Sequence, residues 1–159
     1  MGNEVDMSAA LESFQSAYSK GLIRPMRSQL HGNLCVVRDN ANGDTRFTFA
    51  RVDSTGVVHA IVAILPAEPY QGKPCFALAY AVAEKFRGRG VAKEVVDQTI
   101  AELRNGFKRQ FPKFYIEVVV DKLNEVSNRV ASQVISDAPI EIVDQFSGKP
   151  SMQYFRLVE

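Results

Sequence analysis

The chain has 159 residues, of which 46% are apolar and 23% charged, and its net charge is +1. We expect residues 1–159 to form one domain that is stable without disulfides or metals. A near-neutral charge argues against affinity based on broad neutralisation of phosphates, so nucleic acid is not an expected partner. The apolar runs are too short to span a bilayer and no signal peptide is recognisable, which predicts a cytoplasmic protein without a membrane partner.

The two cysteines, Cys35 and Cys75, each lie in an apolar stretch. We interpret them as reduced thiols on buried strands. No group of cysteines and histidines has the spacing of a zinc site, so no metal site is predicted.

The chain opens with two predicted helices. Apolar residues at helical spacing predict a helix over residues 7–18, with Asp6 or Ser8 as its cap. A second, short helix is predicted over residues 25–30, because proline fits the first turn of a helix.

Strands follow, separated by turn-forming residues. The predicted strands of this antiparallel meander are 34–38, 45–52 and 57–65. Residues 66–74 contain three prolines and a glycine and are predicted to form a loop. Residues 75–83 are apolar at nearly every position, which is typical of a central strand.

The second half alternates helices and strands. Helices are predicted over 91–103 and 126–134, and strands over 114–120, 140–146 and 152–157. The order is therefore α-α-β-β-β-β-α-β-α-β-β. A helical connection makes the strands 75–83 and 114–120 parallel. The predicted fold class is α/β (α+β), with a mixed, mostly antiparallel sheet, one central parallel pair and helices on both faces.

A glycine loop, Arg87-Gly88-Arg89-Gly90-Val91-Ala92, joins the central strand to the next helix. Glycines let the backbone approach a ligand closely, and the free N–H groups at a helix start bind phosphate oxygens. Arg87 and Arg89 add charged donors. The loop lacks the Gly-Lys-Ser/Thr ending of a Walker loop and the three-glycine spacing of a dinucleotide fingerprint. The alternative is a glycine-rich connection with solvated arginines.

The glycine loop resembles the pyrophosphate-binding pattern of the GNAT acetyltransferase family, Gln/Arg-x-x-Gly-x-Gly/Ala. Arg87, Gly90 and Ala92 match this pattern, and Val82 stands at the usual position five residues before it. The element order is also similar to that of the family over nearly the whole chain. The resemblance implies that acetyl-CoA is bound. The cofactor-binding residues it implies are Ala81, Val82, Arg87, Gly88, Arg89, Gly90, Val91, Ala92 and Asn124.

A second motif, residues 124–131, resembles the Asn-x-x-Ser-Asn-x-Val-Ala opening of a helix in the ribosomal-protein N-terminal acetyltransferase branch. The resemblance implies that Asn124 contacts the cofactor and that Ser127 lies near its sulfur. Simple capping of the helix by Asn124 and Ser127 is the alternative. Many members carry a tyrosine acid on this helix, where this chain has Ala131. Ser127 or water would then protonate the leaving thiolate, a fair leaving group.

The implied reaction is direct transfer of an acetyl group to an amine, with a backbone N–H near Val82 facing the developing oxyanion. Glu117, in the middle of a buried strand, is the first candidate for the base. Alternatively, Glu117 faces solvent or pairs with an arginine. Glu84 is the second candidate, with a surface role favoured. His31 and His59 are not expected to be catalytic.

The expected acceptor is a small-molecule amine or a protein or peptide amine. A homodimer is compatible with the sequence. The main alternative function is a non-catalytic acyl-CoA sensor or regulatory module. Acetylation of aminoacyl-tRNA and RNA binding by the Arg-Gly segment are disfavoured, because the chain is near neutral and the segment is not repeated.

Overall fold

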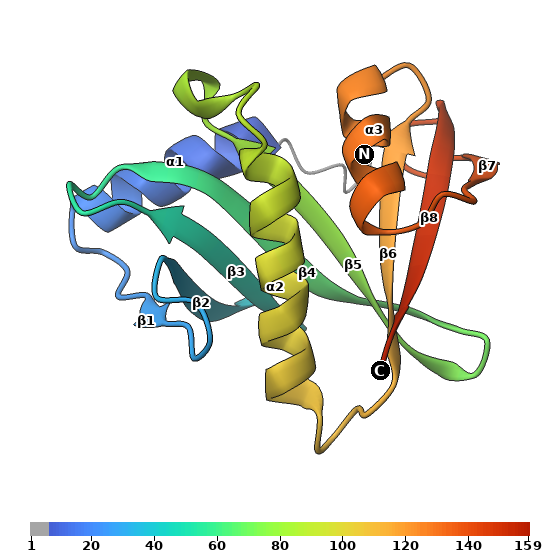
Figure 1. The fold of residues 1–159 in the computed structure, drawn as a ribbon, viewed down its shortest axis with the longest axis horizontal. Coiled ribbons are helices and arrows are strands. Elements are labelled where there is room, and N and C mark those ends of the chain that lie inside the picture. The colour runs from blue at the N-terminus through green and yellow to red at the C-terminus, as the bar shows by residue number, and fades with distance from the viewer. Residues whose placement is uncertain (1–6) are drawn as a thin grey trace.

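The computed structural model describes residues 7–159 (Figure 1). Its helices are α1 (Met7–Ser19), α2 (Val91–Phe107) and α3 (Glu125–Val134), with a 3-10 turn η1 (Glu84–Phe86) before α2. Its strands are β1 (Met26–Arg27), β2 (Leu34–Ala41), β3 (Asp44–Val52), β4 (Val58–Tyr70), β5 (Lys73–Val82), β6 (Phe114–Asp121), β7 (Ile140–Val143) and β8 (Pro150–Val158).

The strands form one sheet in the order β1-β2-β3-β4-β5-β6-β8-β7. Neighbouring strands are antiparallel throughout, except for β5 and β6, which are parallel. Helix α2 makes the connection between these two strands, as a parallel pair requires. The predicted fold class is confirmed.

The helices cover the two faces of the sheet unequally. Helix α1 packs on β4 and β5 from one side, and α2 and α3 lie on the other side (Figure 1). Leu11 and Phe14 of α1 are buried at helical spacing, next to Ile61 and Ala81 of the sheet. Helix α2 buries the apolar side that its sequence predicts, which consists of Val95, Val96, Ile100 and Leu103. Asp6, one of the two predicted caps of α1, lies outside the described residues.

The parallel pair β5–β6 separates soon after it begins. Its register joins only residues 75–77 to residues 115–117. Strand β5 then continues to Val82 and β6 to Asp121, and Figure 1 shows the two strands diverging toward the ends from which α2 and α3 start. The edge of β5 beyond Ala77 therefore has no strand partner on the β6 side within the described residues.

The predicted short helix over residues 25–30 is wrong. Met26 and Arg27 form strand β1 against β2, and the Ser28 N–H donates to the Leu34 carbonyl oxygen at 3.0 Å. The N–H groups of Leu30 and His31 donate to the Glu102 carboxylate of α2. Six residues are too few for a stable helix without a packed face, so contacts with β2 and α2 decide the conformation.

The predicted loop over residues 66–74 is also wrong. Strands β4 and β5 continue through it and meet at a two-residue turn, in which Gln71 has φ 49° and Gly72 has φ 75°. Positive φ at both positions is typical of tight hairpins. The register shifts between Ala67 and Tyr70, and this irregularity accommodates Pro69, which cannot donate to a regular ladder.

Candidate cofactor site

The glycine loop joins the end of β5 to the start of α2. After Val82 the chain makes the turn η1, and α2 begins at Val91. Gly88 has φ 74° and Gly90 has φ 75°, which is left-handed backbone that residues with a Cβ rarely adopt. The two glycines are therefore needed for the path of the chain, which brings it from the strand into the helix.

Backbone groups at the start of α2 remain open to a ligand. Gly90 is the N-cap residue and provides no side-chain cap. A Cβ built on Gly88 or Gly90 would meet no atom within 4 Å, so packing against the protein does not explain either glycine. The first N–H groups of a 17-residue helix carry partial positive charge and point along its axis. An anion is therefore favoured at this end of α2.

The two arginines of the loop have different surroundings. The Arg87 Nε–H donates to the Val82 carbonyl oxygen at 3.0 Å, which braces the turn against the end of β5. The Arg89 guanidinium carbon lies 5.9 Å from the centre of the Phe86 ring. Arg89 is exposed, so its donors can reach an anion bound at the start of α2. Glu84 is exposed as well, in agreement with the surface role favoured for it.

The second motif opens helix α3 beside the glycine loop. Asn124 is its N-cap, and the side-chain oxygen accepts the Ser127 N–H at 3.1 Å, which is the capping contact considered from the sequence. Asn128 accepts the Tyr154 hydroxyl at 2.6 Å and donates to the Asp121 carbonyl oxygen at 3.0 Å. The second asparagine therefore fastens α3 to β6 and β8.

Tyr80, which the sequence reading did not single out, reaches Ser127 across the space between β5 and α3. Its hydroxyl donates to Ser127 Oγ at 3.3 Å, and burial raises the pKa of Tyr80 above its ordinary value. Tyr80 and Val82 are two residues apart on β5 and so share a face. Because Val82 was already a candidate site residue, its neighbour on the same face of β5, Tyr80, could have been proposed from the sequence.

Glu117 lies on the opposite face of the sheet. Its neighbours Ile116 and Val118 point into the core beneath α2 and α3, so alternation along β6 turns Glu117 to the other side. Glu117 pairs with Ala77 at the last rung before β5 and β6 separate. Its carboxylate accepts the Gln153 side-chain N–H at 2.6 Å, and no arginine pairs with it among residues 7–159.

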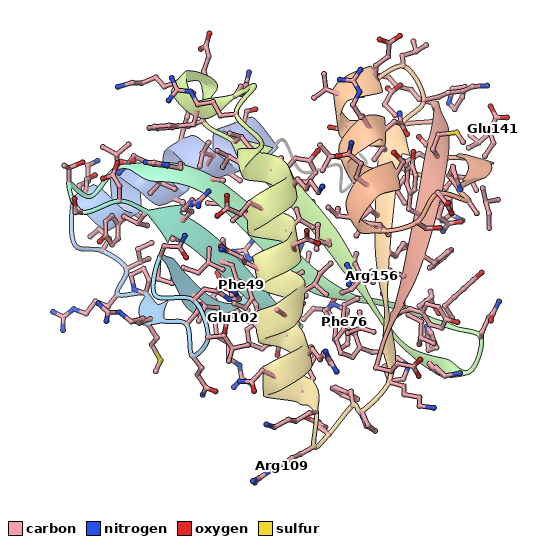
Figure 2. All side chains as sticks on the ribbon, in the orientation of Figure 1. Phe49, Phe76, Glu102, Arg109, Glu141 and Arg156 are labelled. Carbon is pink, nitrogen blue, oxygen red and sulfur yellow. The ribbon has the colours of Figure 1, made fainter. Side chains whose placement is uncertain are left out.

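The two cysteines are free thiols on strands, as predicted, but only Cys75 is buried, while Cys35 is half-buried. Burial, together with the charge of Glu117, raises the pKa of Cys75 to about 12. His59 lies directly beneath the glycine loop and contacts Phe86. His31 lies at the other end of α2, 2.7 Å from Glu102. Figure 2 shows Glu102 and Phe76 on opposite sides of α2 in this region.

The sequence profile of the acetyltransferase (GNAT) family matches residues 8–132. The chain therefore belongs to this family. No curated protein sequence matches it.

Solved structures of acetyltransferases share the fold. An aminoglycoside N(6')-acetyltransferase from Legionella pneumophila is 12% identical, with a TM-score of 0.55 over 72% of this chain and 63% of the other. A ribosomal-protein-S5-alanine acetyltransferase from Vibrio fischeri is 14% identical, with a TM-score of 0.53 over 70% and 61%. A spermidine N-acetyltransferase from Vibrio cholerae, in complex with CoA and spermine, is 15% identical, with a TM-score of 0.50 over 73% and 66%. The chain thus spans less than two thirds of each of these proteins.

No helix within residues 7–159 has the length and apolar character needed to cross a bilayer.

Proposed function

We propose that this protein is an acetyl-CoA-dependent N-acetyltransferase that transfers the acetyl group to a primary amine by direct attack on the thioester. The observation that carries the proposal is the start of α2. Two glycines with left-handed backbone precede a helix that has no side-chain cap. This helix start lies at the end of the sheet where β5 and β6 separate. The match to the acetyltransferase family supports the same assignment.

The glycine loop and the free edge of β5 bind different parts of the cofactor. The backbone N–H groups of residues 88–92 hold the diphosphate, with Arg89 as a charged donor and Arg87 bracing the turn. Ala81 and Val82, at the end of β5, present backbone groups to the extended arm of the cofactor. A chain that lies along this edge follows the hydrogen-bonding pattern of a strand. Asn124 holds the start of α3 beside this arm.

Acetyl-CoA supplies the thioester carbonyl that the amine attacks. Tyr80 holds a proton on its hydroxyl, because its raised pKa keeps the phenol neutral, and Ser127 Oγ orients this group. A phenol in this position protonates a leaving thiolate more readily than an aliphatic hydroxyl does. Glu117 faces the other side of the sheet at the point of separation, so it accepts the proton of an amine that approaches from that side.

The acceptor is a primary amine carried by a small molecule or by a protein. Aminoglycosides, spermidine and a ribosomal protein are named as acceptors for the structural neighbours. The motif at residues 124–131 favours the branch that acetylates ribosomal proteins. A half-buried carboxylate at Glu117 favours acceptors that arrive as cations.

A two-stage measurement tests the proposal. Acetyl-CoA is expected to raise the melting temperature of the purified chain, because a ligand that binds only the folded state stabilises it. Release of free CoA thiol with a panel of aminoglycosides, polyamines and N-terminal peptides then measures transfer. Absence of any thermal shift at millimolar acetyl-CoA would overturn the cofactor assignment. Binding without transfer to any amine would instead favour an acyl-CoA-binding module.

A further inference from the structure

Phe86, in the turn just before the glycine loop, contacts side chains from a different part of the sheet. These side chains belong to β4 and to the turn between β3 and β4. The His59 ring of β4 is stacked on the Phe86 ring of η1, with centroids 3.7 Å apart and an interplanar angle of 12°. Asp53 Oδ2 lies 2.8 Å from His59 Nε2. We call these three residues the loop base.

Asp53, the residue of the loop base farthest from the glycine loop, is held in place by hydrogen bonds. Asp53 Oδ1 accepts hydrogen bonds from the Thr55 N–H at 2.9 Å, the Thr55 hydroxyl at 2.6 Å and the Val57 N–H at 3.1 Å. The other oxygen, Oδ2, therefore meets His59. These contacts lower the pKa of Asp53, so a charged carboxylate orients the imidazole at neutral pH.

His59 and Phe86 connect the loop base to the residues proposed to bind the diphosphate. The Ala83 N–H donates to the His59 carbonyl oxygen at 2.8 Å, so β4 holds the chain immediately before η1 as well as the Phe86 ring. The Arg89 guanidinium lies against the same ring. A shift of His59 would therefore move the turn from which Arg87 to Gly90 continue.

The glycine loop needs such support, because its own residues restrain it weakly. Gly88 and Gly90 have more conformational freedom than other residues, and a Cβ built on either of them would meet no atom within 4 Å. A loop that is ordered only upon binding loses affinity through the entropy of ordering, whereas a loop held in place beforehand does not.

We propose that Asp53, His59 and Phe86 are positioning residues that hold the glycine loop in its phosphate-binding conformation. His59 acts through Phe86 and Arg89, and it takes no part in the acetyl transfer itself. The inference rests on the proposed function, because it concerns the affinity of the same site for the diphosphate of coenzyme A.

A matched control exists at the far end of α2. His31 Nδ1 lies 2.7 Å from Glu102 Oε2, so this pair has the same chemistry as His59 and Asp53. It fastens residues 30 and 31 to α2 and has no contact with the glycine loop. His31→Ala is therefore expected to lower the melting temperature without changing the affinity for the cofactor.

The experiment compares two ligands by calorimetry. Acetyl-CoA carries the diphosphate, and acetyl-pantetheine lacks it. An aromatic stacking contact is worth about two- to tenfold in an equilibrium constant, so His59→Ala is expected to weaken acetyl-CoA binding by about that factor. The same variant should bind acetyl-pantetheine as the wild type does, and kcat at saturating acetyl-CoA should stay unchanged. His59→Phe keeps the stacking and should retain most of the affinity for acetyl-CoA.

Each other outcome overturns the inference. Wild-type affinity of His59→Ala for acetyl-CoA would show that the loop needs no support from His59. An equal loss for acetyl-pantetheine, or an equal loss in His31→Ala, would show a general structural role. If His59→Ala does not fold, Asp53→Asn is measured with the same two ligands and the same criteria. If the wild-type chain does not bind acetyl-CoA, the proposed function is wrong. If the wild type binds acetyl-CoA and the variants bind it equally well, only the role of the loop base is wrong.

Discussion

The starts of α2 and α3 lie beside each other at the open end of the β5–β6 pair, yet their backbone N–H groups are satisfied differently. Helix α3 begins with Asn124, whose side-chain oxygen accepts the Ser127 N–H. Helix α2 begins with Gly90, which has no side chain to offer. Both helices follow a strand and need donors satisfied in their first turn. The first turn of α3 is capped by a side chain, and the first turn of α2 has no side-chain cap.

The difference separates two tasks within the proposed site. In the proposed site, the start of α2 binds the anion and has no side-chain cap of its own. The glycine loop and the loop base hold the backbone of this site in its binding conformation. The start of α3 is capped by Asn124 and fastened by Asn128, and it holds Ser127 Oγ 3.3 Å from the Tyr80 hydroxyl. In the proposed site, the phosphate is bound at the start of one helix, and the Tyr80 hydroxyl of β5 is oriented by the start of the other. Substitutions at the two helix starts are therefore expected to affect different properties of the protein.

Gly90→Arg is expected to abolish the stabilisation of the chain by acetyl-CoA. The side chain would fill the space at the start of α2, and the left-handed backbone would cost roughly 1–2 kcal/mol of folding free energy. Thermal denaturation with and without acetyl-CoA measures both effects. Gly43→Arg is the control, because Gly43 has φ 89° in the β2–β3 turn, and β3 approaches α2 from this turn at Phe107, the opposite end of the helix from Gly90. A normal acetyl-CoA shift in Gly90→Arg would place the phosphate site elsewhere.

Tyr80→Phe is expected to lower kcat by about 10²-fold with little change in KM for acetyl-CoA, because the variant keeps the ring and loses only the proton donor. Steady-state kinetics measure the change. Tyr115→Phe removes an exposed hydroxyl from the other face of β6 and should leave kcat unchanged.

A second tyrosine tests whether the position of the phenol matters. Ala131 is buried one turn after Ser127, and side chains on a helix lean toward its N-terminus. A phenol at position 131 would therefore lie over the turn that contains Ser127. Ala131→Tyr combined with Tyr80→Phe should recover part of the lost kcat. Unchanged kcat in Tyr80→Phe alone would leave Ser127 or water as the donor.

Asn124→Ala is expected to destabilise the fold by about 1 kcal/mol, the usual cost of removing a helix cap. Urea denaturation measures the loss, and Asn124→Asp should restore most of the stability because aspartate caps equally well. Its effect on acetyl-CoA affinity should be much smaller than that of Gly90→Arg. A comparable loss of affinity would show that Asn124 binds the cofactor directly and that the two helix starts share one task.

Asp53→Asn is expected to change the dependence of stability on pH. The folded-state pKa of Asp53 is lowered, so its stabilising contribution is complete above the ordinary aspartate pKa of about 3.9 and is lost as the pH falls below it. The wild type should exceed the variant in stability at pH 7, and the difference should shrink below about pH 4. Asp137→Asn, which removes an exposed carboxylate outside the loop base, is the control. A difference that does not vary with pH would contradict a charged Asp53 beneath the loop.

Local patterns were sufficient where the chain forms its own contacts. The apolar spacing of α2, the β-branched run of β6 and the turn-rich composition between strands predicted the corresponding elements. They failed at residues 25–30 and 66–74, because pairing with β2 and with β5 outweighs the local preference of short proline-containing segments. The candidate site shows the same contrast. The glycine loop is a contiguous motif, whereas the contact between Tyr80 and Ser127 joins residues 47 positions apart in the chain and could not be predicted from either segment.

The order of most elements, the parallel crossover through α2 and the glycine loop before this helix could be predicted from local residue patterns. These features depend on residues close together in the chain, where steric limits and hydrogen-bonding groups act locally. The contacts between distant segments were needed to show that β5 and β6 separate after Ala77, that Glu117 and Tyr80 face opposite sides of the sheet, and that His59 stacks on Phe86 next to the glycine loop. These features arise from strand register and side-chain packing between distant segments, and a local pattern of residues does not contain that information.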